Sequence, residues 1–172
     1  MPTNWPAFIS TLEPRAATTG PATDAELSRV EKVVGTAFPS DLRELFLQTN
    51  GILDDGYGPV LTLSAFRSAP FVDGRGVAKP APFPAHNYSV EQYTLLQRKL
   101  WRDDAGVSHD TFVVIGTDIG GNPYGFFPAP SGAVCIQSIA HDDGSADPAI
   151  YTLEQYLRYY FAECPWFTKK AP

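Results

Sequence analysis

Two helix stops and one proline between residues 26 and 51 constrain the fold of this chain more than any other feature of its sequence. The stretch reads ELSRVEKVVGTAFPSDLRELFLQTNG. Apolar residues recur at helical spacing before Gly35, and again between Ser40 and the pair Asn50-Gly51. Glycine and asparagine favour the left-handed conformation that ends a helix, and proline is accommodated where a helix begins. The pattern therefore predicts a hairpin of two short helices.

Capping residues mark the starts of three further helices. Asn4 can cap a helix that runs to residue 12. Capping boxes, in which Ser or Thr precedes Glu or Gln by three residues, occur at Thr23–Glu26, Ser89–Gln92 and Thr152–Gln155. The first box opens the hairpin, and the other two open separate helices. The apolar residues expected to share a face in each helix are Trp5, Phe8, Ile9 and Leu12; Leu27, Val30 and Val34; Leu42, Leu45 and Phe46; Tyr93, Leu96 and Leu100; and Leu153, Tyr156, Leu157, Tyr160 and Phe161.

Short runs of apolar, strand-compatible residues predict strands at residues 60–63, 112–115, 124–127 and 133–139. The run 112–115 is apolar throughout, so we expect this strand to be buried on both faces. The last three runs follow one another through turns, an order that is typical of an antiparallel meander.

The order of these elements indicates an α+β fold, with a mainly antiparallel sheet and helices packed on it. At 172 residues, 44% of them hydrophobic, the chain is expected to form a single domain, 1–172. Residues 1–22 would supply the N-terminal helix and a connecting loop, and residues 23–161 the main body. The proline-rich stretch 71–85 is expected to cross the surface in extended form, because proline does not fit the interior of a sheet.

Charge and cysteine content narrow the possible environments and partners. The formal charge of −6 disfavours binding to nucleic acid or to an anionic membrane surface, and it suits a basic partner. No run approaches the roughly 18 apolar residues that cross a bilayer. Cys135 and Cys164 are too few for a disulfide framework, and the apolar run around Cys135 is typical of a buried, reduced thiol. We therefore expect a cytoplasmic protein.

The sequence contains none of the patterns that mark a catalytic or metal site. His86, His109 and His141 stand far apart, without the spacing of metal ligands. No nucleophile elbow or phosphate-binding loop occurs. The stretch 142–147 clusters aspartates of the kind that calcium prefers, but its spacing fits no known calcium loop, so a solvated acidic loop is favoured. We expect no cofactor, no metal and no enzymatic activity.

Several motifs occur together in a characteristic order. They comprise Val30-Glu31, Gly35, Phe38-Pro39, Asp41-Leu42, Leu45 and Asn50-Gly51; then residues 112–116 with Asp118, Gly121 and Asn122; and finally residues 133–139 and the helix after Thr152. In this order they resemble the SUKH superfamily over about residues 23–161, although the stretch 71–101 has no counterpart there. That superfamily contains bacterial immunity proteins that bind and silence a toxin, and fungal regulators of cell-wall assembly. The resemblance implies a sheet covered by helices and a function through protein binding.

Acidic pairs occur in three predicted loops, at Asp54-Asp55, Asp103-Asp104 and Asp142-Asp143. If the fold brings the pairs to one side, they form an electronegative surface that would meet the basic cleft of a toxin domain such as a nuclease. The alternative is three separate solvated turns, because aspartate favours turns in any case.

Aromatic residues in loop-like segments are the second group of candidates: Tyr57, Phe71, Phe83 and Trp101. Exposed aromatic side chains would anchor a partner, whereas buried ones would fill the core. The predicted partner-binding residues are Asp54, Asp55, Tyr57, Trp101, Asp103, Asp104, Asp142 and Asp143.

The resemblance and the charge together favour an immunity-type protein that neutralises a bacterial toxin by stoichiometric binding. One alternative is a general regulatory or interaction module without a toxin partner. The other is an enzyme of unrecognised type, which would group a histidine with carboxylates of perturbed pKa in one pocket.

Overall fold

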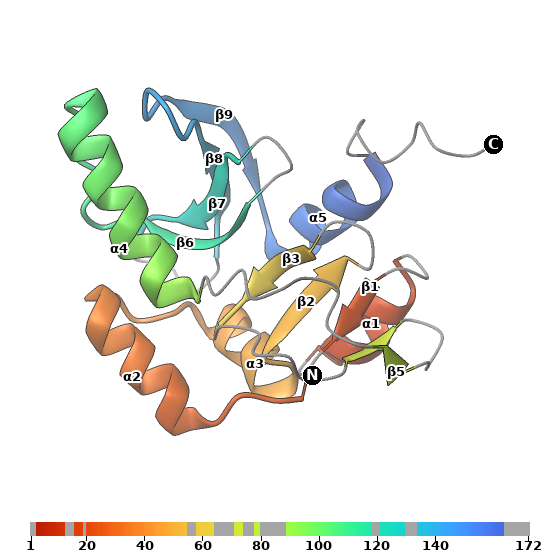
Figure 1. Cartoon of the computed structure of the whole chain (residues 1–172). Coiled ribbons are helices and arrows are strands. Elements are labelled where there is room, and N and C mark those ends of the chain that lie inside the picture. The colour runs from red at the N-terminus through yellow and green to blue at the C-terminus, as the bar shows by residue number, and fades with distance from the viewer. Residues whose placement is uncertain are drawn as a thin grey trace.

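A computed structural model describes residues 3–12, 16–18, 20–54, 58–63, 71–73, 78–79, 89–117, 121–129 and 134–163. These residues form two antiparallel sheets with helices packed on them (Figure 1). The α+β fold class predicted from the sequence is therefore confirmed.

All five predicted helices are present. They are α1 (Trp5–Ser10), α2 (Asp24–Val34), α3 (Ser40–Gln48), α4 (Val90–Leu100) and α5 (Leu153–Arg158), and the π-helical segments η1 (Trp101–Ala105) and η2 (Tyr159–Glu163) continue α4 and α5. Caps are observed at Asn4, Thr23–Glu26, Ser89 and Thr152–Gln155. Gly35 ends α2 in the left-handed conformation, with φ of 72°, and so confirms the predicted first stop of the hairpin.

The four-stranded sheet is an antiparallel meander of β6 (Val113–Thr117), β7 (Pro123–Phe126), β8 (Ile136–Ile139) and β9 (Ala146–Tyr151). Its first three strands match predicted runs. The sequence does not predict β9, because Asp147 and Pro148 disfavour strands. The fold tolerates them because β9 lies at the sheet edge and its register with β8 shifts between Gln137 and Ile139, which leaves the proline unpaired.

The five-stranded sheet has the order β3 (Gly58–Thr62), β2 (Gly51–Asp54), β1 (Ala16–Thr18), β4 (Phe71–Asp73) and β5 (Ala78–Lys79). Only β3 matches a predicted strand. The interpretation of residues 13–22 as a loop is wrong for β1, which pairs with both β2 and β4. The expectation that residues 71–85 form no interior strand is wrong for β4, which pairs with β1 on one side and β5 on the other. The prolines at 80, 82 and 84 come after β5 in the chain, so they do not interrupt this pairing. Strands of two to five residues carry too little periodicity to be recognised.

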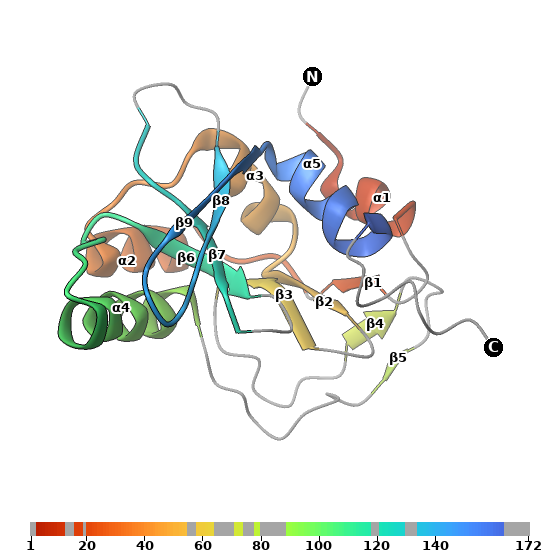
Figure 2. The ribbon, with the colours of Figure 1, turned by 90° about the horizontal axis from the view of Figure 1, so that it is seen from above.

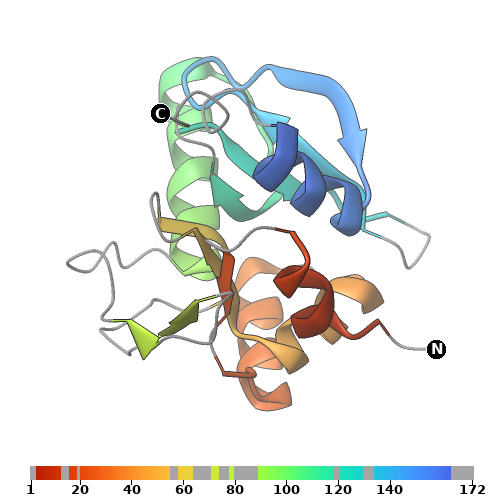
Figure 3. The same ribbon diagram turned by 90° about the vertical axis from the view of Figure 1, so that its right-hand side faces the viewer.

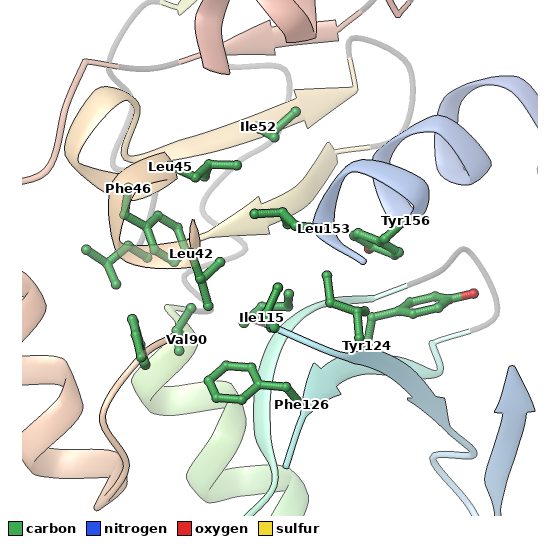
Figure 4. Packing of buried hydrophobic residues seen from close by; sticks show 14 of the residues in the cluster. Leu42, Leu45, Phe46, Ile52, Val90, Ile115, Tyr124, Phe126, Leu153 and Tyr156 are labelled. Atoms are coloured by element: carbon green, nitrogen blue, oxygen red, sulfur yellow. The ribbon is translucent and has the colours of Figure 1, made fainter. Parts of the chain in front are cut away.

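Buried residues form two clusters on opposite faces of β6. Val113 and Ile115 belong to the main cluster, in which residues of α3, α5 and both sheets meet (Figure 4). Phe112 and Val114 belong to a second cluster that includes Trp101. This alternation confirms that the strand predicted at 112–115 is buried on both faces. Figure 3 shows the four-stranded sheet between α4 and α5.

Helix α4 covers the sheet with a polar side. The Thr94 hydroxyl accepts from the N–H of Val114 at 2.9 Å and donates to the carbonyl of the same residue at 3.3 Å. Arg98 Nε donates to the Phe112 carbonyl at 2.8 Å. Because β6 lies at the edge of its sheet, these side chains supply the partners that a neighbouring strand would provide. The face of α4 that carries Leu96 and Leu100, which we predicted as an apolar stripe, therefore points away from the sheet.

Candidate interaction surface

Two of the three acidic pairs lie together at the C-terminal end of α4. Asp103 and Asp104 belong to η1, and Asp142 and Asp143 lie in the turn that joins β8 to β9. Figure 1 shows this turn near the upper end of α4, and the turn is bonded to Gln97 and Trp101. We call the four aspartates the acidic end.

Three hydrogen bonds hold the β8–β9 turn, two against the helix formed by α4 and η1 and one against the segment that follows it. Gln97 Nε2 donates to the His141 carbonyl at 3.2 Å, and Trp101 Nε1 donates to the Ala140 carbonyl at 2.8 Å. His109 Nε2 lies 2.8 Å from the Gly144 carbonyl, which can only accept, so this nitrogen carries the proton. Because these donors are anchored in the second cluster or beside it, the turn is held in a defined position relative to η1.

The acidic end keeps a negative charge after its ion pairs are counted. Lys99 pairs with Asp103, and the nearby Arg102 pairs with Asp110. Asp104 and Asp142 are exposed and form no ion pair with the described part of the chain. The Lys99 ammonium lowers the pKa of Asp103 from its ordinary value. Hydrogen bonds from the Ser145 hydroxyl and N–H lower that of Asp143, so the pKa shifts at this end favour the ionised carboxylates.

Of the third acidic pair, the structure describes only Asp54, which belongs to the other sheet. Asp54 is the last residue of β2, where its backbone pairs with Gly58 and Ala16. Asp55 and Tyr57, also predicted to bind a partner, lie outside the described residues, as do Phe83 and the side chain of Phe71. Asp103, Asp104, Asp142 and Asp143 therefore belong to elements that contact each other, whereas Asp54 ends a strand of the other sheet, and a single surface for all three pairs stays a prediction.

Trp101 belongs to the core. It is 0% exposed, its indole packs edge-on against Phe112 with ring centroids 5.8 Å apart, and its N–H is bonded to the Ala140 carbonyl. The interpretation of Trp101 as an exposed anchor for a partner is therefore corrected. In the sequence, Trp101 follows Leu100, the last apolar residue of the predicted helix, and is therefore assigned to a loop-like segment. In the structure, η1 continues the helix and turns the indole inward.

The exposed leucines of α4 form a surface that the sequence did not predict. Leu96 is 39% exposed and Leu100 is 37% exposed, and Leu95 is exposed on the adjacent side of the helix. Leu96, Leu100 and Asp104 follow one another at four-residue steps, so they form one row that leads into the acidic end. We call Leu96 and Leu100 the leucine face. The polar residues at 94, 97 and 98 were the sequence signal that could have identified the buried side.

The described histidines, His109 and His141, contact neighbouring side chains, and Cys135 is exposed to solvent. His109 stacks edge-on against Trp101, and His141 Nδ1 lies 3.1 Å from Asn122 Oδ1. Cys135 is exposed, contrary to the prediction, because it lies between two residues whose side chains point inward.

Across the ranges that the structure describes, no three His, Cys, Asp or Glu side chains form a group that could hold a metal ion. Nor do those ranges contain a helix with the length and hydropathy of a bilayer span.

Motif residues of the helical hairpin hold the fold together. Glu31 Oε1 accepts from the Phe38 N–H at 2.7 Å, and its second oxygen pairs with Arg43 at 2.5 Å. Asp41 Oδ1 accepts from the Val134 N–H at 3.2 Å and so ties α3 to the segment before β8. The acidic residues of the motif thus fix the turn of the hairpin and its contact with the meander.

A family profile matches most of this chain. No curated protein matches the chain. The sequence profile of the SMI1 / KNR4 family (SUKH-1) matches residues 21–159, which include the hairpin, the meander and α5. This match extends over most of the chain and over every motif that carried the resemblance. The chain therefore belongs to the SMI1 / KNR4 family (SUKH-1) within the SUKH superfamily.

Proposed function

We propose that this protein acts by stoichiometric binding to another protein, without catalysis, and that its partner is a bacterial toxin domain that it neutralises. The observation that carries this proposal is the acidic end, where two elements far apart in the sequence present Asp103, Asp104, Asp142 and Asp143 together. A basic active-site cleft, such as that of a nuclease, is the surface that complements such a charge. Membership of the SMI1 / KNR4 family supports a binding role.

A regulatory module without a toxin is the second candidate, because the family takes its name from SMI1 and KNR4 and the resemblance links it to cell-wall regulators. Both functions use protein binding, so the surface alone does not separate them. The identity of the partner separates them.

The test is co-purification of the native chain with the product of the neighbouring gene, followed by a protection assay in cells. If the proposal is correct, the two proteins elute as a complex of fixed stoichiometry, and expression of this chain restores growth to cells that produce the toxin. A partner that is not toxic would support the regulatory module. A complex that forms but leaves the toxin active would contradict neutralisation by binding.

A further inference from the structure

The outward side of α4 combines apolar and acidic groups in one row. Leu96 and Leu100 are exposed, and Asp104 follows them at the next four-residue step. Lys99 and Asp103, which form an ion pair, lie on the adjacent row. Tyr93 borders the leucine face on the inner side, where its hydroxyl lies 3.5 Å from the Gly121 carbonyl.

The polar contacts that the described residues make with α4 lie on other sides of the helix than the leucine face. The opposite side of α4 packs on the sheet through Thr94, Gln97 and Arg98, which bond backbone groups of β6 and of the β8–β9 turn. On the α2 side, the helix is held by the ion pair of Arg29 with Glu91, and Figure 2 shows α2 and α4 side by side. The leucine face takes part neither in the contacts with the sheet nor in the ion pair with α2. Apolar residues exposed in this way are typical of interaction surfaces.

We propose that the leucine face is the apolar centre of the surface on which the partner docks, an inference that rests on the proposed function. The occupant is a protein segment whose apolar side chains are flanked by lysine or arginine. Interfaces place apolar residues at the centre and charged residues at the rim, and here the rim is the acidic end. Asp104, Asp142 and Asp143 form no ion pair within the described ranges, so they favour basic residues on the occupant.

Charge also argues against a second copy of this chain as the occupant. Two copies that met through α4 side by side in the same direction would bring their acidic ends together, and like charges in contact disfavour such an arrangement. The chain as a whole carries a formal charge of −6, which adds to this repulsion.

The experiment uses a random peptide library displayed on phage and selected against the folded full-length chain. We expect the selected peptides to carry apolar side chains next to Lys or Arg and to bind more weakly at high salt. In the native protein they should shift the amide NMR signals of residues 95–104 and 141–144. The double variant Leu96→Ser with Leu100→Ser should lose about tenfold or more in peptide affinity.

Leu47→Ser is the matched control, because Leu47 is a similarly exposed leucine, at 41%, on α3. Circular dichroism establishes that each variant is folded, and if the double variant does not fold, the NMR shifts of the native chain decide. Selected peptides rich in Asp or Glu, absence of any enriched peptide, or shifts confined to other elements would overturn the inference. So would self-association that the double variant abolishes, because the occupant would then be a second copy.

The peptide experiment is independent of the toxin. Failure to recover a cognate partner from the neighbouring gene would count against the proposed function and leave the peptide result intact. A recovered partner that binds the double variant as tightly as the native chain would overturn the docking surface alone.

Discussion

At the scale of single residues, Arg98 occupies an environment that is unusual for its residue type. Arginine is normally exposed, yet this side chain is 9% exposed. Its Nη1 donates to the Val34 carbonyl at 3.0 Å, at the negative end of the α2 dipole, and its Nε donates to the Phe112 carbonyl. Burial lowers the pKa of Arg98, but an arginine remains charged because its ordinary pKa lies far above neutrality.

We expect Arg98→Ala to lower the free energy of unfolding by about 3 kcal/mol, because two buried carbonyls would lose a charged donor. Arg102→Ala is the control on the same helical stretch. Its pair with Asp110 is exposed on both sides, so its loss should change the free energy of unfolding far less. Urea denaturation followed by circular dichroism measures both values, and equal losses would contradict a specific role for Arg98.

At the scale of elements, the sequence identified helix starts better than helix faces. Capping boxes act within three residues, so Thr23–Glu26 and Thr152–Gln155 can be recognised locally, and both are closed in the structure. The buried face of α4 depends instead on what lies beneath it. The edge of β6 requires hydrogen-bond partners there, so polar residues face inward.

The two closed boxes differ in one charge, which leads to a pH prediction. Hydrogen bonds from the Thr23 N–H, at 2.7 Å, and from its hydroxyl lower the pKa of Glu26, whereas Gln155 makes the corresponding bond without a charge. A carboxylate with a lowered folded-state pKa stabilises the protein above its ordinary pKa, and this contribution is lost as pH falls through the folded-state value. The Glu26→Gln variant retains a neutral box and loses this dependence.

We therefore expect native protein to exceed Glu26→Gln in unfolding free energy by about 0.5 kcal/mol at neutral pH, through the charge at the start of α2. The difference should shrink as pH falls below the ordinary carboxyl range. Urea denaturation of both proteins at neutral and acidic pH measures it, with Gln155→Ala as a pH-independent comparison. A difference that is the same at both pH values would show that the charge contributes nothing.

At the scale of the whole molecule, charge is distributed unevenly. The acidic end gathers aspartates from η1 and from the β8–β9 turn, while Asp54 ends β2 in the other sheet. Figure 1 shows these regions at different sides of the molecule. Long-range attraction of a basic partner should therefore be directed toward the end of α4.

Neutralising Asp104 and Asp142 to Asn should slow association with the partner recovered by co-purification by about three- to tenfold at low salt. The effect should fade at high salt, because ions screen charges beyond about 10 Å. Stopped-flow or surface plasmon measurements give the rates, and Asp54→Asn serves as the control that should change them little. Equal slowing by the control would mean that net charge alone matters.

The sequence by itself determined the local parts of this protein. These are the helix caps, the stop at Gly35 and the alternation that buries residues 112–115 on both faces, because each depends on neighbours in the chain. Tertiary structure decided the rest. The short strands β1, β4 and β5 form only by pairing with one another and with β2, and β9 forms only where a sheet edge tolerates Pro148. The leucine face and the acidic end also arise from packing, since only contact with the edge of β6 and with Trp101 determines which side of α4 meets solvent.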